Sequence, residues 1–575
     1  MYILGINAYH GDSSACIYKD GTLIAATEEE RIRRVKHWAG LPTEAIKFCL
    51  DEANVKLSEI DYITVSRDPK AKLGEKVIRT LKSGISLKAV KDRGANSIKI
   101  TGIKKDIANS LGFDVNQVKA QVKFIEHHRS HMASSYHVSP FQEAAILSID
   151  GMGDFTSTMR GIGRGNSIEV IDSVSYPHSI GIFYTSFTQY LGFPHYGDEY
   201  KVMGLSPYGN PKYMDKVWDV IIKKENGLFE LNPNYFRHFK EGVAMSWESG
   251  SPEIGRIFSD AFIDQFGPLR LKGEELTQYH KDLASSVQRV TEEIIFMMAE
   301  DLYEKTGLKN LCITGGVAQN SVANGKILAN TSFEHLFVPP AGHDAGTSVG
   351  SALYHYHVNL KNPRLPFEHQ AYTGAKFNND EIQSYLDGEN IPYKFVQEEN
   401  ELIADVANLL HEGKVIGWFQ GRAEFGPRAL GNRSIIVDPS RDDAKELLNS
   451  KIKRRESFRP FAPSILKEAT SDYFEVVDDV PFMEKVYQIK EEKRSVIPAV
   501  THVDGSGRLQ TVTKKDNSRY YQLIKKFSEL SGIPILLNTS FNENEPIVNT
   551  PQHAYACFDR TDMDVLVLGN FILTR

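Results

Sequence analysis

The 575-residue sequence has few of the features that mark secreted or membrane-bound proteins. Its four cysteines are isolated, with no CxxC pair, which argues against a disulfide framework or a thiolate zinc site. No stretch approaches the roughly 18 apolar residues of a membrane span. The first residues, MYILGINAYHGD, lack the basic segment and the long apolar run of a signal peptide. We therefore expect a cytoplasmic protein with no membrane partner.

An excess of positive charge is also absent. The formal net charge of -7 argues mildly against a nucleic-acid partner, because phosphate contacts need a basic face. A hydrophobic content of 41% and a charged content of 25% are typical of a globular protein. The length is several times that of a common domain, so the chain should form two or more cores.

Three apolar segments each end in glycine and a polar residue: YILGINA before YHGDSS, EAAILSIDG, and NLCITGG. We predict strands there, a hairpin with its turn at Asp20–Gly21, and a helix from Pro42 to Ala53. Glycine and free N–H groups allow backbone to approach phosphate. The pattern therefore predicts an α/β fold whose strand ends meet at one ligand site.

The sequence LKNPRLPFEHQAYTG has the proline-rich, aperiodic character of a linker and places a domain boundary near residues 360 to 375. We predict one domain over residues 1–360 and a second over residues 375–575. The second begins with an amphipathic helix, ELIADVANLLHEG, and a strand, KVIGWFQG.

The segment FIEHHRSH contains a candidate metal site. On a helix His127 and His131 share one face and could bind a single cation, whereas His128 points away. Asp150 and Asp344 lie in glycine-rich surroundings and could complete the site. Two imidazoles with carboxylates and no thiolate suit Fe, Zn or Mn. By spacing alone, a partly exposed helix face stays an alternative.

Other motifs also allow two interpretations. The glycines of ITGGVAQN suit either a nucleotide or simple packing, and GDEYKVMGLSPYG suits either a substrate-facing loop or a capped turn. In the C-terminal part, basic residues alternate with Phe, Pro and Gly. This rigid setting favours bidentate binding of phosphates over a solvated face. These basic residues are Arg422, Arg428, Arg433, Lys453, Arg454, Arg455 and Arg459.

The sequence resembles the ATP-dependent O-carbamoyltransferases, which include the nodulation enzymes and those that carbamoylate antibiotics such as cephems and tobramycin. The resemblance covers nearly the whole chain. It is carried by GINAYHGDSSACIYKDG, EEERIRRVKH, HHRSH, SIDGMGD, GDEYKVMGLSPYG, TGGVAQN, GHDAGTSVGSAL, GWFQGRAEFGPRALGNRSI, SFRPFAPS and LLNTSFNENEPIV.

The resemblance implies a fold and a reaction. The first part should have the duplicated α/β fold of the actin, sugar-kinase and Hsp70 ATPases, in the branch of the threonylcarbamoyl transferases. The second should be a YrdC-like α/β domain that converts carbamoyl phosphate and ATP into carbamoyladenylate. The first part would then transfer the carbamoyl group to a hydroxyl of a small-molecule acceptor, a natural product or a sugar, and release AMP. A homodimer is one assembly compatible with this family.

The resemblance also assigns residues. His10 corresponds to the catalytic histidine, and iron(II) is the favoured metal, with Mn or Zn as alternatives. His128 is expected to be a bystander or a support for the ligands. The metal ligands would be His127, His131, Asp150 and Asp344; the carbamoyladenylate site Gly181, Gly316 and Asn320; the ATP and carbamoyl phosphate site Arg428, Lys453, Arg459, Arg508 and Ser540; and the acceptor site Asn7 and Lys36.

Three rival functions make different demands on the sequence. Threonylcarbamoyl modification of tRNA would require a basic surface and partner subunits, whereas this chain is acidic and already contains both catalytic parts. Carbamoyl transfer in hydrogenase maturation would bring paired-cysteine zinc fingers and an acylphosphatase domain, and neither is visible in the sequence. A non-catalytic ATP-binding module would leave the histidine pair and the arginine-rich second part without a purpose. The sequence does not identify the acceptor.

Overall fold

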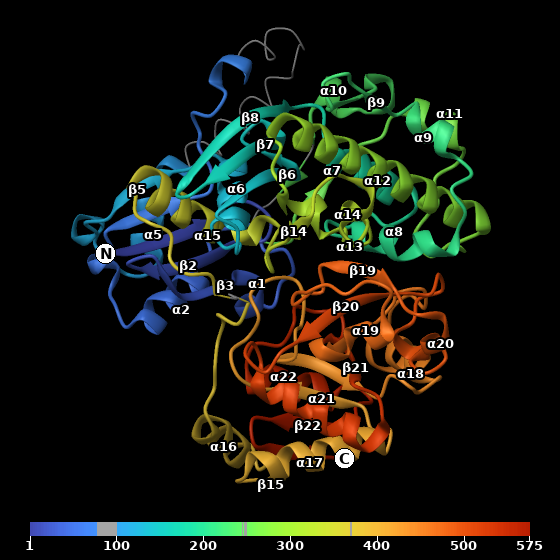
Figure 1. Cartoon of the computed structure of the whole chain (residues 1–575). Coiled ribbons are helices and arrows are strands. Elements are labelled where there is room, and N and C mark those ends of the chain that lie inside the picture. The colour runs from blue at the N-terminus through green and yellow to red at the C-terminus, as the bar shows by residue number, and fades with distance from the viewer. Residues whose placement is uncertain (77–99, 244, 247–249, 369–370) are drawn as a thin grey trace. The chain divides into compact units, whose positions relative to one another are not determined.

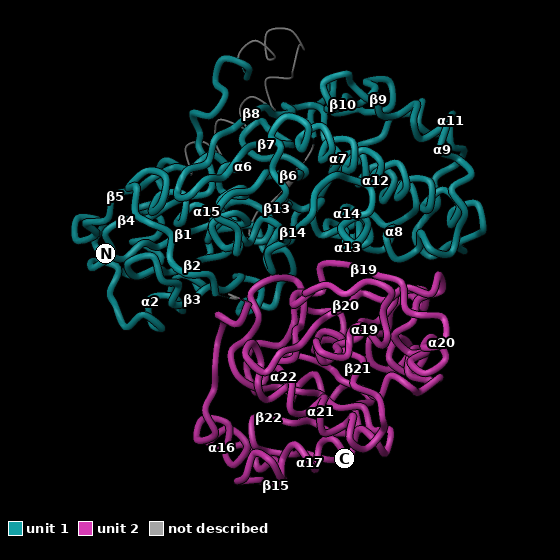
Figure 2. The backbone as a smooth tube through the Cα atoms, in the orientation of Figure 1, with its two compact units in different colours: residues 1–368 teal, residues 369–575 magenta. Residues whose placement is uncertain are grey.

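The computed structural model describes residues 1–76, 100–243, 245–246, 250–368 and 371–575. The chain divides into two compact units, Met1–Glu368 and His369–Arg575, shown in different colours in Figure 2. Residues 369–370 of the predicted linker lie outside the described residues. No helix in the described part of the chain is both long enough and apolar enough to cross a membrane.

The first unit begins with a five-stranded sheet in the order β3-β2-β1-β4-β5. β1, β2 and β3 form an antiparallel meander that includes the predicted hairpin, and β4 and β5 run parallel to β1. The strand bounds are β1 Tyr2–Asn7, β2 Ser14–Lys19, β3 Thr22–Glu28, β4 Tyr62–Val65 and β5 Gln121–Phe124.

Helices cover both faces of this sheet. Leu4 and Ile6 of β1 pack in one core with α2 (Thr43–Ala53) and α5 (Ile103–Ser110). Gly5 faces the opposite side of the sheet, because successive residues of a strand alternate between its two faces. A Cβ on Gly5 would lie 2.3 Å from the carbonyl oxygen of Ser348, so this glycine lets α15 (Thr347–Leu353) pack closely.

A second five-stranded sheet repeats this topology, in the order β14-β13-β6-β7-β8. β6, β7 and β8 form an antiparallel meander, and β13 and β14 run parallel to β6. Two α/β halves of one strand order confirm the duplicated fold that the resemblance implies. The strand bounds are β6 Glu143–Gly153, β7 Thr156–Arg164, β8 Ser167–Ser175, β13 Asn310–Thr314 and β14 His335–Phe337.

Two helices are exchanged between these halves (Figure 1). α6 (His127–Tyr136) follows the last strand of the first sheet but packs mainly on β6 and β13 of the second. α15 follows the last strand of the second sheet but packs mainly on β1 and β4 of the first. The two helices also pack on each other. Three of the candidate metal ligands lie at the starts of these helices: His127 and His131 in α6, and Asp344 just before α15.

A long helix, α12 (Gln278–Thr306), packs against α7 (Ile180–Tyr190) and α8 (Glu199–Leu205). α8 corrects one expectation, because most of GDEYKVMGLSPYG is helical rather than a loop. After β13 the chain forms only a single short helical turn, α13. The other elements of this unit are α1 Glu29–Arg33, α9 Met214–Trp218, α10 His238–Glu241, α11 Asp260–Phe266, α13 Ser321–Asn324, α14 Ile327–Asn330, β9 Ile221–Lys223, β10 Phe229–Leu231, β11 Met245–Ser246 and β12 Glu253–Ile254.

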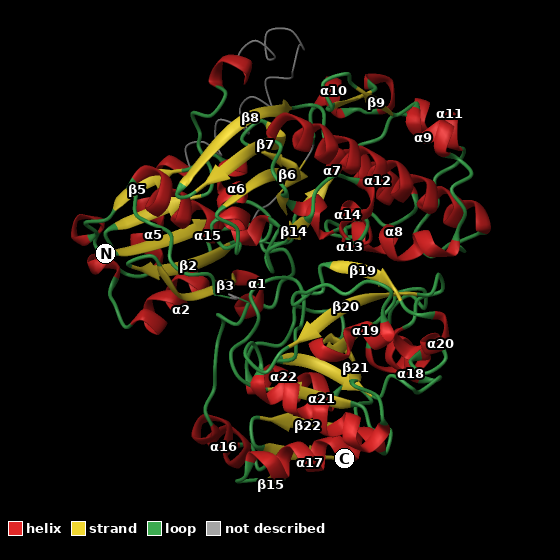
Figure 3. Ribbon diagram, viewed as in Figure 1, coloured by secondary structure: helices red, strands yellow, loops and turns green. Residues whose placement is uncertain are grey.

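The second unit is built on one mixed sheet of nine strands, seen as yellow arrows in Figure 3. Its order is β15-β23-β22-β16-β17-β21-β18-β20-β19. Helices α17 and α21 pack together and share its apolar core, so the second predicted α/β part is confirmed as an α/β unit. The bounds are β15 Lys394–Phe395, β16 Ile416–Phe419, β17 Arg433–Val437, β18 Ala462–Leu466, β19 Lys485–Gln488, β20 Ser506–Val512, β21 Ile535–Ser540, β22 Val565–Leu568, β23 Phe571–Thr574, α16 Asn379–Gly388, α17 Glu399–His411, α18 Ala444–Leu447, α19 Thr470–Tyr473, α20 Glu491–Arg494, α21 Ser518–Ser531 and α22 Pro551–Asp559.

Candidate active site and metal centre

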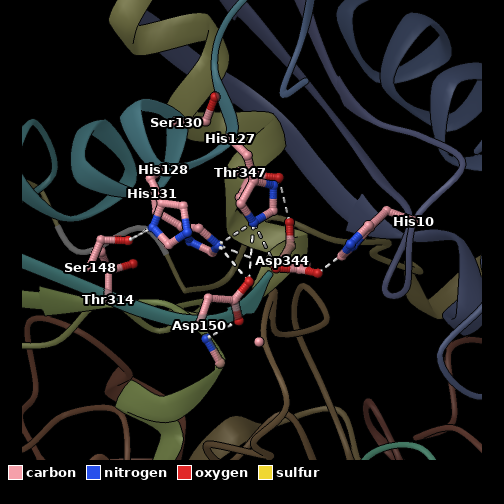
Figure 4. A network of polar contacts seen from close by, with 12 residues as sticks. His10, His127, His128, Ser130, His131, Ser148, Asp150, Thr314, Asp344 and Thr347 are labelled. Atoms are coloured by element: carbon pink, nitrogen blue, oxygen red, sulfur yellow. Dashed lines mark hydrogen bonds and ion pairs between the residues drawn. The ribbon is translucent and has the colours of Figure 1, made fainter. Parts of the chain in front are cut away.

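Four buried side chains meet inside the first unit: His127, His131, Asp150 and Asp344. One potential ligand atom from each lies within 4.8 Å of the others. The two histidine Nε2 atoms are 3.1 Å apart, and each lies 3.2 Å from a carboxylate oxygen, His127 from Asp150 and His131 from Asp344. Figure 4 shows the four side chains directed toward one place.

The start of α6 fixes the two histidines. Glu126 is the N-cap, and its carboxylate accepts the backbone N–H groups of His128 and Arg129. Asp154, in the β6–β7 turn, accepts the N–H of His127 at 3.0 Å. His127 and His131 then lie about one turn apart on the same helix face. The residue pattern gave no sign of either carboxylate, because their role depends on backbone groups that such a pattern does not show.

His128 supports this arrangement from the other side of α6. Its ring is buried and contacts the hydroxyl of Ser148 at 2.8 Å and the carbonyl oxygen of Thr156 at 3.1 Å. Burial, together with the neighbouring rings of His127 and His131, lowers the pKa of His128 well below its ordinary value. A neutral His128 with the proton on Nε2 donates to Thr156 and accepts from Ser148. It therefore ties α6 to β6 and β7.

The two carboxylates each make a second contact. Asp150 lies in β6, and its Oδ1 accepts the N–H of Gly316 at 2.9 Å. Burial alone would raise the pKa of Asp150, but its contacts with His127 and His131 hold it well below the usual range. Burial would lower the pKa of His131, whereas hydrogen bonds to the two aspartates raise it to about 9.

The donor set fits a divalent transition-metal ion. Two imidazole nitrogens and two carboxylate oxygens are directed at one place from buried positions, and the neighbouring Nε2 atoms of His127 and His131 would both face a bound cation. The formal charge of two carboxylates balances such an ion. The four residues predicted as ligands are thus close enough to hold one ion.

His10 lies beside this cluster in the turn between β1 and β2. Its Nδ1 is 2.5 Å from Oδ2 of Asp344, and its ring centroid is 5.5 Å from that of His127. Burial would lower the pKa of His10, but the charge and hydrogen bond of Asp344 raise it. Asp344 therefore orients His10 with one oxygen and faces His131 with the other.

Asn7 shapes the same turn. Its amide group donates to the carbonyl oxygens of Gly11 and Asp12 at 3.1 and 3.2 Å, and its oxygen accepts from the Ser66 hydroxyl. The side chain is buried, which places it under the turn. Lys36 is exposed in the loop after α1.

Gly181 and Gly316 approach the metal-ligand cluster from two different segments. A Cβ on Gly181, at the start of α7, would lie 2.7 Å from Cα of Gly151, and Gly316 donates its N–H to Asp150. Asn320 is further along, where it caps α13. Its side-chain amide exchanges two hydrogen bonds with that of Gln288, at 2.9 and 3.0 Å.

Arginines gather in the second unit at the predicted phosphate site. Arg508 lies on β20, and Arg428, Arg455 and Arg459 lie in the loops before β17 and β18. Burial, together with the positive charges of these three residues, lowers the pKa of the Arg508 guanidinium well below its ordinary value. Mutual repulsion of this kind is relieved when a polyanion binds among the guanidinium groups.

Other basic residues of this unit contact the protein backbone. Arg433 is buried, donates to the carbonyl oxygens of Gln420 and Ala375, and stacks 3.6 Å from the Phe419 ring centroid. Arg422 donates to the carbonyls of Thr373 and Gly374. Lys453 is buried, contacts the carbonyl of Ser540, and lies 2.7 Å from two oxygen atoms of Asn542. The basic residues of this pattern are therefore of two kinds: arginines that cluster around Arg508, and side chains that bind backbone carbonyl groups.

Two family profiles match the chain. The carbamoyltransferase N-terminus matches residues 2–353, and the carbamoyltransferase C-terminus matches residues 407–575. An uncharacterized protein of Synechocystis sp. is 42% identical, and the alignment covers 100% of this chain and 97% of that protein. Nodulation protein NolNO of Sinorhizobium fredii is 37% identical over 99% of this chain and 80% of its own length. Among solved structures, T. kodakarensis HypF aligns with 63% of this chain and 48% of its own at 11% identity and a TM-score of 0.31.

Proposed function

The chain belongs to the carbamoyltransferase family and is a carbamoyltransferase, and from this premise we propose a two-step reaction. In the first step the second unit makes carbamoyladenylate from carbamoyl phosphate and ATP. In the second step the first unit transfers the carbamoyl group to a hydroxyl of a small-molecule acceptor. The observation that carries the proposal is the 2.5 Å contact between His10 and Asp344 beside the four-residue cluster.

The arginine cluster supports the first step. Carbamoyl phosphate and ATP bring many negative charges to one place, and Arg428, Arg459 and Arg508 can neutralise and align them. One water is consumed, phosphate leaves the carbamoyl group, and a carbamate oxygen bonds to the α-phosphorus of ATP as pyrophosphate departs. Lys453 and Ser540 lie together at the end of β21, where Lys453 fixes the strand end.

His10 supports the second step. Asp344 binds Nδ1 of His10, which leaves Nε2 to take the proton of an acceptor hydroxyl, as a general base does. The hydroxyl oxygen then bonds to the carbamoyl carbon. The bond from that carbon to the phosphate oxygen breaks, and AMP leaves with the electron pair. Gly181 and Gly316 provide close backbone approach beside Asp150, where we place the adenylate.

We assign His127, His131, Asp150 and Asp344 as ligands of a divalent ion, with iron(II) favoured by the resemblance. When bound, such an ion supplies fixed positive charge for the phosphate of the adenylate. The two histidines would hold it from α6, Asp150 from β6 and Asp344 from the turn before α15. Asp344 also keeps His10 oriented, so the proposed base and the ligands share one carboxylate.

One incubation tests the function. The purified protein is given ATP, carbamoyl phosphate and ferrous iron, and the mixture is assayed for pyrophosphate and, by mass spectrometry, for carbamoyladenylate. We expect both products in equal amounts. If neither forms, the proposal is wrong. Pyrophosphate without carbamoyladenylate, even after rapid quenching, would instead indicate simple ATP cleavage.

A further inference from the structure

A second imidazole–carboxylate pair lies close to His10. Asp12 follows His10 by two residues, and its Oδ1 is 2.7 Å from Nδ1 of His37. Glu30, on α1, accepts the backbone N–H of His37 at 2.8 Å. Burial alone would lower the pKa of His37, but the carboxylates of Asp12 and Glu30 raise it to about 9. The ring is therefore positively charged at neutral pH; Asp12 holds the ring at Nδ1, and Glu30 holds the backbone of the same residue.

The polypeptide adopts unusual backbone conformations to form this pair. Tyr9, Asp12 and His37 have positive φ angles of 56°, 56° and 53°, which residues with side chains seldom adopt. Such conformations persist only where the surrounding fold enforces them, and they are common at functional sites. Hydrogen bonds of Asn7 and Glu30 to this backbone provide the enforcement here.

Two hydrogen-bonding groups beside the pair are unused. Within the described part of the chain, Nε2 of His37 and the hydroxyl of Tyr196 have no hydrogen-bond partner. The Tyr196 ring meets the His37 ring edge-on, with centroids 5.2 Å apart. The Tyr196 oxygen would be 2.6 Å from a Cβ on Gly11, the residue between His10 and Asp12. The Tyr196 hydroxyl therefore lies beside the residue that follows the proposed base, and its ring contacts the ring of His37.

Gly197 keeps one of these groups accessible. A Cβ at this position would lie 2.4 Å from Nε2 of His37. Gly197, which follows Tyr196, has a φ of 83°, and this backbone conformation favours glycine. The backbone can thus pass the His37 ring without a side chain that covers Nε2.

We propose that His37, held by Asp12, and Tyr196 bind the acceptor and orient its reacting hydroxyl toward His10. This inference rests on the proposed function. The imidazolium Nε2–H and the phenolic O–H are both donors, so they bind oxygen lone pairs. They therefore select an acceptor with a second oxygen beside the reacting hydroxyl, as in a polyol. The reacting hydroxyl gives its proton to His10 while its oxygen bonds to the carbamoyl carbon and AMP leaves.

Tyr196→Phe is the sharpest variant. It removes a hydroxyl with no partner in the described structure, so the melting temperature should stay unchanged. We expect the KM for the acceptor to rise at least tenfold, with less than a twofold change in the carbamoyladenylate formed per enzyme. Tyr18→Phe is the matched control, because the Tyr18 hydroxyl is likewise unpaired among the described residues, but is buried at the far end of β2. It should leave the acceptor KM unchanged.

His37→Gln and Asp12→Asn test the pair itself. A purely structural role would lower the melting temperature and reduce both steps together. Acceptor binding by His37 predicts a selective rise in acceptor KM in both variants, larger for His37→Gln because it replaces the charged imidazolium donor with a neutral amide on a flexible side chain. Equal loss of adenylate formation and transfer, or an unchanged acceptor KM, would overturn the role of the pair.

The probe acceptors are glycerol and methyl α-D-glucopyranoside, compared with 1-propanol and cyclohexanol, with carbamate esters detected by mass spectrometry. We expect esters of the polyols at least tenfold above those of the single alcohols. Equal yields, or adenylate formation without any polyol ester, would overturn the inference while the proposed function stands. Absence of carbamoyladenylate in the wild-type protein would instead remove the proposed function and this inference with it.

Discussion

Asp344 contacts His10 and His131 with different oxygen atoms of one carboxylate. Oδ2 lies 2.5 Å from Nδ1 of His10, and Oδ1 lies 3.2 Å from Nε2 of His131. A single buried group thus joins the proposed base to the proposed metal ligands. Because of this link, a change of Asp344 would disturb both sites, and more selective variants are needed to separate them.

Replacing His10 should separate the two steps. In His10→Ala we expect the rate of pyrophosphate release to stay within about twofold of wild type, because the arginine cluster is untouched. Carbamoyl transfer should fall by roughly 10²–10⁴-fold, the usual contribution of a general base. Quenched-flow detection of carbamoyladenylate and of carbamoylated acceptor measures both steps. Equal loss of the two would refute the assigned role.

Removing one guanidinium should stop the first step. We expect Arg459→Ala to lower pyrophosphate release by roughly 10²-fold or more, because the phosphates of the bound substrates then lose one of their charged hydrogen-bond donors. Lys526→Ala is the control, since Lys526 is partly exposed on α21 and pairs only with Glu529 among the described residues. An unchanged rate in Arg459→Ala would remove this residue from the phosphate site.

Asp150→Asn should weaken metal binding. The substitution removes one charged ligand and keeps the side-chain shape, so we expect at least about a tenfold loss of affinity for the divalent ion. Metal analysis after dialysis against a weak chelator gives the occupancy without an activity assay. The control is Asp260→Asn, whose side chain is 91% exposed. Equal occupancy in Asp150→Asn and wild type would contradict the ligand assignment.

Gly153→Ala should disturb His127. A Cβ on Gly153 would lie 2.0 Å from Cδ2 of the His127 ring, so the ring or the strand must move. We expect a loss of about 1–3 kcal/mol in the free energy of unfolding, as overpacking commonly causes, together with lower metal occupancy. Gly151→Ala is the matched control, because among the described residues no atom other than those of its chain neighbours lies within 4 Å of its added Cβ. Denaturant unfolding measures both variants.

Glu484 predicts a pH-dependent stability of the second unit. Burial is the main reason that its pKa is raised from the ordinary 4.5 to about 7. Between these pH values the folded chain binds more protons than the unfolded chain, so stability falls as the pH rises through 7. Glu484→Gln should raise the melting temperature by about 2–4 °C at pH 8 and change it little at pH 5. Calorimetry of this variant beside the exposed Glu529→Gln checks the expectation.

Local features of the fold followed from the sequence. The i, i+4 spacing of His127 and His131 was enough to place them on one face of a helix, and the hairpin turn at Asp20–Gly21 was recognisable from its residues. The shared strand order of the two sheets was not, because it depends on pairings between strands far apart in sequence. Only the family resemblance pointed to that duplication.

The candidate site shows a similar division. Asp344 lies 213 residues from His131, so no spacing rule could bring them together. The arginine-rich segment gave no sign that Arg433 is buried against backbone carbonyls while Arg459 lies beside Arg508. Arg433 follows Gly431 and Asn432, and Arg459 stands between Phe458 and Pro460; neither set of neighbours shows which way the side chain points. The Asp12–His37 pair was missed because HGD resembles an ordinary turn.

The exchange of α6 and α15 has a consequence for folding. Each half of the first unit depends on a helix that the other half supplies in sequence. A fragment that ends after β5, or one that begins at β6, would leave a sheet face without its covering helix and expose apolar surface. The two halves of the first unit should therefore unfold in one cooperative transition, and neither should be obtainable alone as a stable protein.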